Sequence, residues 1–77
     1  MELKTNCEIR GISQRVDDKN MNHYYVNLED EKGESCKFPV DQKSNIDLKS
    51  FKKGDKVNVV LDLSVKYGSL KIINITK

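Results

Sequence analysis

The chain has 77 residues, of which 36% are hydrophobic and 34% are charged, and its formal net charge is +2. A chain this short has room for one hydrophobic core, so we expect residues 1–77 to form a single β-barrel domain. No apolar run approaches the length of a membrane span, and the polar N-terminus does not resemble a secretion signal. We therefore expect a soluble, cytoplasmic protein without a membrane partner.

The basic residues are concentrated toward the C-terminus. Residues 1–51 carry eight Lys and Arg against ten Asp and Glu, whereas residues 52–77 carry six Lys against two Asp. A basic segment of this kind is typical of nucleic-acid-binding proteins, but a lysine-rich composition also arises from coding bias. The charge pattern alone leaves both interpretations open.

The first run, residues 3–16, alternates between apolar and polar side chains, as a half-buried strand does. After Gly11 the apolar phase slips by one residue, to Ile12 and then Val16. A glycine at a phase slip is typical of a β-bulge, so we expect a long first strand that bends near its middle. The polar residues 17–22 then form a loop.

Residues 24–40 predict a β-hairpin. A three-residue loop, residues 31–33, places Gly33 at the left-handed position that such loops favour. This register puts Leu28 opposite Cys36 and Val26 opposite Phe38, so that the inward face is continuously apolar. Pro39 cannot donate a hydrogen bond to a neighbouring strand, so we expect it at the end of the third strand or at an unpaired edge.

The remainder of the chain predicts a short connector and a second hairpin. Residues 41–53 are polar, and Ile46, Leu48 and Phe51 suit one short turn that closes an end of a barrel. Two further strands follow, joined by a turn at Gly68. The inward phase of the last strand is ambiguous, because both Ile72 and Ile73 are apolar.

The sequence therefore predicts an all-β fold, a small five-stranded barrel with at most one short helical turn. An SH3-like barrel is the main alternative, because it also uses five short strands. The side chains expected to face inward are Leu3, Cys7, Ile9, Tyr24, Val26, Leu28, Cys36, Phe38, Val57, Val59, Leu61, Leu63, Leu70 and Ile72. The two cysteines are expected to be buried thiols that act as small hydrophobes, and a disulfide is an alternative if their strands are neighbours.

Catalysis is poorly supported by the residues. The one histidine, His23, stands at the start of a strand, where we expect a solvated surface residue. The acidic pairs at residues 17–18 and 29–31 fall in predicted turns, where solvated side chains are usual. No residue spacing suits a zinc site, and the isolated glycines do not form a phosphate-binding loop. We expect a protein that is not an enzyme and that has no cofactor and no metal.

A binding surface is the remaining candidate. The outward face of the first hairpin would present His23, Tyr25, Asn27 and Lys37, and its flanking loops would add further basic and aromatic side chains. Such a surface suits single-stranded DNA or RNA, because bases stack on aromatic rings while cations contact the phosphates. The residues predicted to form it are Arg10, Arg15, Lys19, Tyr25, Asn27, Lys37, Lys66 and Tyr67.

The predicted arrangement resembles the OB-fold. Three runs precede a polar connector and two follow it, the first strand is bulged, and residues 51–59 with residues 68–72 are similar to the last hairpin of many such domains. In that fold the usual ligand surface is formed by the second and third strands and the loops that flank them. The short connector makes the chain look more like compact single-stranded-DNA-binding proteins of phages and mobile elements. The resemblance covers nearly the whole chain, and it is one of fold, without a diagnostic motif.

A protein–protein interaction module is the alternative function. The barrel would then act as an adaptor or an inhibitor, or as a homodimer that pairs its own edge strands. Residues 70–76 form an apolar strand with few charges, which is the edge expected to be available for such pairing.

Overall fold

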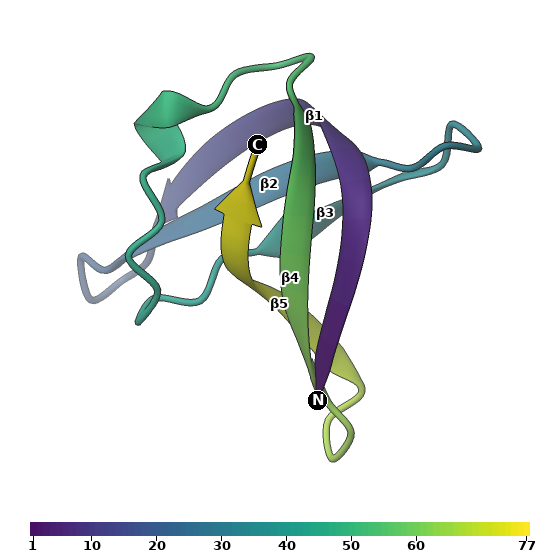
Figure 1. The fold of residues 1–77 in the computed structure, drawn as a ribbon. Coiled ribbons are helices and arrows are strands. Elements are labelled where there is room, and N and C mark those ends of the chain that lie inside the picture. Colours follow the sequence, from purple (N-terminus) through teal and green to yellow (C-terminus); the bar gives the residue numbers. More distant parts are fainter.

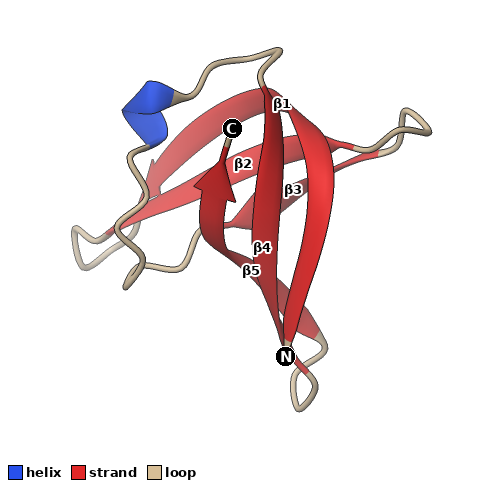
Figure 2. Cartoon of the chain, in the orientation of Figure 1, coloured by secondary structure: helices blue, strands red, loops and turns tan.

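The computed structural model describes residues 1–77 and contains five strands and one turn of 3-10 helix (Figures 1 and 2). The strands are β1 Glu2–Val16, β2 Asn22–Glu29, β3 Ser35–Pro39, β4 Lys56–Ser64 and β5 Ser69–Thr76, and the helical turn η1 is Leu48–Ser50. The predicted all-β fold with at most one short helical turn is confirmed. No helix in the structure has the length and apolar character needed to cross a membrane.

The long strand β1 lies at the centre of the sheet and is shared by two neighbours. Its residues 2–8 pair with β4, and its residues 8–16 pair with β2. The register with β2 shifts between Ile9 and Gly11, so Arg10 is the extra residue of a β-bulge. The predicted bulge is confirmed, and Figure 1 shows β1 curving strongly along its length.

The five strands follow the order β3-β2-β1-β4-β5, and all hydrogen-bonded neighbours are antiparallel. The two edge strands approach each other at one parallel bridge between Val40 and Ile72. There the Asp41 amide donates a hydrogen bond to the Ile72 carbonyl at 2.8 Å. No continuous ladder joins β3 to β5, so hydrogen bonds do not close the sheet into a barrel.

The β2–β3 hairpin has the predicted register. Leu28 lies opposite Cys36 and Val26 lies opposite Phe38. Gly33 has φ +81°, the left-handed conformation expected for the three-residue loop. Pro39 is the last residue of β3, as expected. Since the Val40 amide donates to Tyr24 in β2, the Pro39 nitrogen points to the free edge, where its missing N–H costs no hydrogen bond between the strands.

One core fills the interior of the curved sheet. Its buried residues are Ile9, Val26, Leu28, Val57, Val59, Leu61, Ile72 and Ile75. Seven of these eight belong to the predicted inward set, and Ile75 resolves the ambiguous phase of the last strand. Val60 lies opposite Asn74 but Leu61 lies opposite Ile72, so Ile73 is the extra residue of a second bulge. That bulge lets both Ile72 and Ile75 face the core.

Four side chains that were predicted to be buried are partly or largely exposed. Leu3 and Tyr24 are 38% and 39% exposed, Cys36 is exposed, and Cys7 is only half-buried. The alternation of these residues is correct, and Cys7 packs against the core from the middle of β1. Leu3, Tyr24 and Cys36 lie near strand ends that extend past the single small core. Phe38, Leu63 and Leu70 are half-buried for the same reason. Both cysteines are free, and β2 separates their strands β1 and β3 in the sheet.

The connector after β3 packs against the core, as predicted. Ile46, Leu48 and Phe51 are half-buried against the core residues. At the end of the connector the Gly54 amide donates to the Ile9 carbonyl at 2.7 Å, and the Ile9 amide donates to the Asp55 carbonyl at 2.8 Å. These two bonds attach the connector to β1 next to its bulge.

Candidate nucleic-acid interface

The side of β1, β2 and β3 that faces away from the core carries half of the predicted binding residues. Val26 and Leu28 are buried, so the alternate residues of β2 point to the opposite face. The strand registers then define the residues of this outer face. From β1 they are Gly11, Ser13 and Arg15, from β2 His23, Tyr25 and Asn27, and from β3 Lys37 and Pro39.

The outer face brings four of the predicted residues together. Tyr25 lies between Ser13 and Pro39, and Asn27 lies between Gly11 and Lys37. Arg15 lies opposite His23, one row further along β2. The outer face therefore has an aromatic ring at its centre and a cation at each of two opposite corners.

Small neighbours flank this centre on the β1 side, and Tyr25 and Asn27 are themselves half-buried. On the β1 side, Tyr25 and Asn27 are flanked by Ser13 and Gly11, and a Cβ atom added to Gly11 would meet nothing within 4 Å. The side-chain oxygen of Asn27 is buried without a hydrogen-bond partner.

The predicted cations differ in whether a carboxylate already binds them. Arg15, Lys19 and Lys37 make no ion pair, and Lys19 lies in the loop between β1 and β2. Arg10 lies 3.1 Å from a Glu8 oxygen and 3.2 Å from a Glu29 oxygen. Two carboxylates therefore offset the Arg10 charge, which weakens its suitability as a phosphate contact.

His23 is not the solvated residue that the sequence predicted. Its Nε2 lies 2.8 Å from Asp17 Oδ2, and its Nδ1 lies 3.1 Å from Gln42 Nε2. The imidazole thus joins the β1–β2 loop to the segment after β3. The hydrogen bond from His23, together with those from the Met21 and Lys19 amides, lowers the pKa of Asp17 below its ordinary value.

Lys66 and Tyr67 lie elsewhere. They belong to the turn between β4 and β5, which lies beside the N-terminus in Figure 1. Tyr67 is 75% exposed, and Lys66 Nζ lies 5.3 Å from the centre of its ring. The structure therefore spreads the eight predicted residues over four places: four lie on the outer face, Arg10 lies at the β1 bulge, Lys19 lies in the β1–β2 loop, and Lys66 and Tyr67 lie in the β4–β5 turn.

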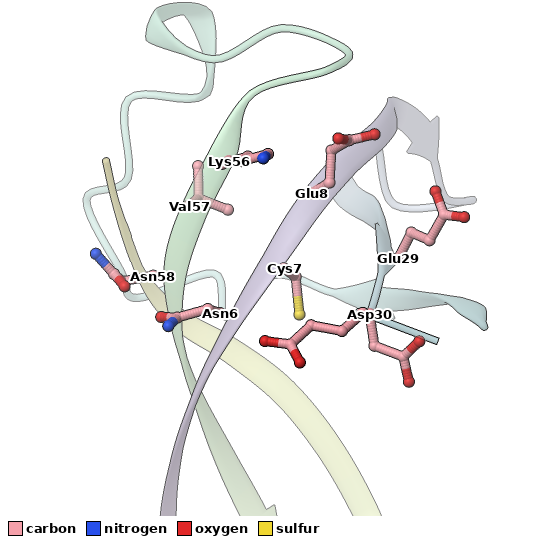
Figure 3. Close-up of a pocket in the computed structure, with 9 residues that line it drawn as sticks. Asn6, Cys7, Glu8, Glu29, Asp30, Lys56, Val57 and Asn58 are labelled. Carbon is pink, nitrogen blue, oxygen red and sulfur yellow. The ribbon is translucent and has the colours of Figure 1, made fainter. Parts of the chain in front are cut away.

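An acidic pocket lies at the C-terminal end of β2, opposite to the end that carries His23. It has a volume of about 570 Å³ and is lined by Glu8, Glu29, Asp30 and Glu31 together with one lysine, Lys56 (Figure 3). None of the eight predicted residues lines it. Because its carboxylates repel phosphate, this end of the outer face is unsuitable for an anionic ligand.

Sequence reasoning placed His23 on the outward face but expected it to be solvated, and it missed the contacts of His23 with Asp17 and Gln42. The alternation along β2 places His23 on the same face as Tyr25, and this signal was present in the sequence. The contact with Gln42 spans 19 positions and depends on the path of the chain after β3, for which the sequence has no local signal.

No protein-family model, no curated protein and no solved structure matches this chain.

Proposed function

We propose that this protein is a non-catalytic single-stranded nucleic-acid-binding protein whose ligand crosses the outer face of β1, β2 and β3. The observation that supports the proposal is the arrangement of Tyr25 between the unpaired cations Arg15 and Lys37 on one face. The ring offers a stacking surface for a base, and the cations offer contacts for the phosphates on either side of it.

The binding is weak and largely independent of sequence. One base stacked on a tyrosine contributes about 1–3 kcal/mol. The net charge of +2 is too small to match the charge density of a duplex, which favours a single strand as the ligand. DNA and RNA both present the bases and phosphates that this face would contact.

Lys66 and Tyr67 would form a second contact for the same strand. Their exposure leaves both the ring and the ammonium group available to a ligand. Arg10, in contrast, would act mainly by offsetting the charges of Glu8 and Glu29 beside the interface.

We also propose that the domain is OB-like, with the single-stranded-DNA-binding proteins of phages and mobile elements as its functional analogues. The bulged first strand shared by two antiparallel partners and the incompletely closed sheet fit a partly open barrel of this kind. An SH3-like barrel is the alternative architecture.

A protein partner is the second candidate, and one observation favours it. Met1, Leu3, Val65 and Tyr67 are exposed apolar side chains near the end of the molecule that holds the N-terminus. A surface of this kind suits an adaptor, an inhibitor or a homodimer. Pairing through β5 is less favourable, because the Asp41 amide already binds the Ile72 carbonyl on its free edge.

Fluorescence anisotropy with labelled oligo-dT over a series of salt concentrations tests the proposed function. We expect affinity to fall as salt rises, with a slope of about −0.7 in log K against log [salt] for each phosphate neutralised. Lys37→Ala should make that slope shallower by about 0.7, whereas Lys32→Ala, at the acidic hairpin tip, should leave it unchanged. Absence of binding at low salt would reject the proposal.

A further inference from the structure

Two rings, not one, lie on the outer face of β2. His23 and Tyr25 are two residues apart on the same strand and therefore point to the same side of the sheet. At the rise of an extended strand, their Cα atoms are about 6.7 Å apart. The two rings thus stand one behind the other along β2, with Arg15 across from the first and Ser13 across from the second.

The His23 ring is held in place from both sides. Asp17 engages Nε2 at 2.8 Å and Gln42 engages Nδ1 at 3.1 Å. Asp17 is itself fixed, because its other oxygen accepts hydrogen bonds from the Lys19 and Met21 amides at 2.8 and 2.9 Å. A ring held at both nitrogens loses little further conformational freedom when a ligand binds.

The same contacts determine what the ring offers to a ligand. The His23 side chain is 34% exposed, and both of its polar atoms are already hydrogen-bonded. Its exposed part is therefore mainly carbon, which suits stacking better than hydrogen bonding or catalysis.

We propose that His23 is a second stacking platform beside Tyr25, positioned by Asp17 and Gln42, and that the two rings take adjacent bases of a pyrimidine-rich single strand. This inference rests on the proposed function and specifies its ligand. Bases stacked on each other are about 3.4 Å apart, roughly half the spacing of the two rings. A strand that uses both rings must therefore separate its adjacent bases.

The cost of separating adjacent bases determines whether the protein prefers pyrimidine or purine strands. Purines stack strongly on each other and resist separation, whereas a run of thymines or uracils is flexible and weakly stacked. Modest preferences of single-strand binders arise from such differences in stacking strength and flexibility. The two-ring platform therefore favours oligo-dT over oligo-dA.

The experiment measures anisotropy of labelled dT and dA oligonucleotides of equal length with the wild-type protein, His23→Ala and His23→Phe. We expect His23→Ala to weaken dT binding at least about fivefold and to reduce the preference for dT, without changing the salt slope. His23→Phe keeps a ring but loses both positioning contacts, so it should retain the preference for dT and bind dT less tightly than the wild type but more tightly than His23→Ala. In NMR spectra of the wild-type protein, the carbon-bound protons of the His23 ring should shift upfield when dT is added.

Two glutamines provide a matched test of positioning. Gln42→Ala removes a contact to the His23 ring without changing charge, and we expect it to weaken dT binding about two- to fivefold and to reduce the upfield shift. Gln14→Ala is the control, because Gln14 donates to Asn22 at 2.8 Å and belongs to the opposite face of the hairpin. Gln14→Ala should change neither the affinity for dT nor the upfield shift of the His23 ring protons.

The possible failures are distinguishable. Binding of dT that depends on Tyr25 but is unchanged in His23→Ala would overturn this inference and leave the proposed function standing. Equal wild-type affinity for dT and dA, or an unchanged His23 ring signal, would also overturn it. Absence of wild-type binding to both oligonucleotides would reject the proposed function itself.

Discussion

The two ends of β2 share one face of one sheet, yet they differ in charge and in the partners of their side chains. At one end, His23 and Tyr25 are accompanied by Arg15, which makes no ion pair. At the other end, Glu29 is close to Arg10 and borders the acidic pocket. The two ends therefore differ in how well they would suit an anionic ligand.

The difference shows that counting basic residues is a poor guide to a binding surface. Arg10 lies in the central strand β1, but Glu8 and Glu29 offset its charge. Lys37 is a single lysine on a short edge strand, and its charge is available to a ligand. Whether a carboxylate lies within contact distance decides which cations remain for phosphate.

The largest expected effect on oligo-dT affinity comes from removing the ring of Tyr25. Tyr25→Ala should weaken oligo-dT binding by about 5- to 150-fold, the equivalent of about 1–3 kcal/mol of stacking. The salt slope should hardly change, because no charge is removed. Tyr67→Ala should also weaken binding, by less, because Tyr67 lies outside the outer face. Tyr25→Phe, which keeps the ring, should bind like the wild type, and thermal unfolding of each variant monitors its fold.

Charge reversal at each end of the β2–β3 hairpin tests the contrast directly. Lys37→Glu should weaken oligo-dT binding at low salt by about 30-fold, because an attraction of about 1 kcal/mol becomes a repulsion of similar size, a change of about 2 kcal/mol. Lys32→Glu makes the same change of charge at the hairpin tip, beside Asp30 and Glu31, and should have a much smaller effect. If anisotropy titrations show equal losses of oligo-dT affinity for Lys37→Glu and Lys32→Glu, the affinity depends only on the net charge of the protein and not on the position of the lysine.

Neutralising the acidic end should extend the interface. Glu29→Gln removes one of the two carboxylates close to Arg10, so affinity should rise by about threefold and the salt slope should become steeper by up to about 0.7. Glu31→Gln makes the same change of charge without releasing an arginine and should give a smaller gain. A larger gain from Glu31→Gln would show that Arg10 remains unavailable to the ligand.

Acid stability should report the contact between Asp17 and His23. The hydrogen bond from His23, with those from the Met21 and Lys19 amides, lowers the pKa of Asp17 below its ordinary value of 3.8. A carboxylate with a lowered pKa in the folded state stabilises the protein above the ordinary value, and this stabilisation is lost as the pH falls through the lowered pKa.

The corresponding measurement is urea unfolding of Asp17→Ala from pH 6 to pH 2. The difference in free energy of unfolding from the wild type should be largest above about pH 5 and should shrink below about pH 4. Asp18→Ala is the neighbouring control, since Asp18 makes no hydrogen bond or ion pair through its side chain, and it should show no such dependence. If Asp17→Ala lowers the free energy of unfolding by the same amount at every pH, the charge of Asp17 does not contribute to stability, and this prediction is wrong.

Much of the fold could be predicted from the sequence because alternation and turn chemistry are local. The period of two along β2 and β3, with Gly33 in the loop, was sufficient to predict the correct pairing of Val26 with Phe38. The slip after Gly11 revealed the bulge, although Arg10 is its extra residue. Burial near strand ends was harder to predict, because alternation cannot show that Leu3 and Tyr24 extend past the core.

The candidate interface was predictable only where it follows the strands. The parity of β2 placed Tyr25 and Asn27 on one face, and the register added Lys37. The offset charge of Arg10 and the two contacts of His23 depend on how separate segments meet in space, which no local pattern records. The separation of Tyr67 from Tyr25 likewise follows from the path of the curved sheet.

The most direct test of the central claim is a chemical-shift titration of isotope-labelled protein with oligo-dT at low and moderate salt. We predict that the largest shifts fall on residues of the outer face, above all Arg15, Tyr25, Asn27 and Lys37, and that they diminish at moderate salt. Residues of the acidic pocket should shift little. Shifts absent at both salt concentrations, or confined to β5 and the N-terminal end of the molecule, would contradict the account and favour a protein partner.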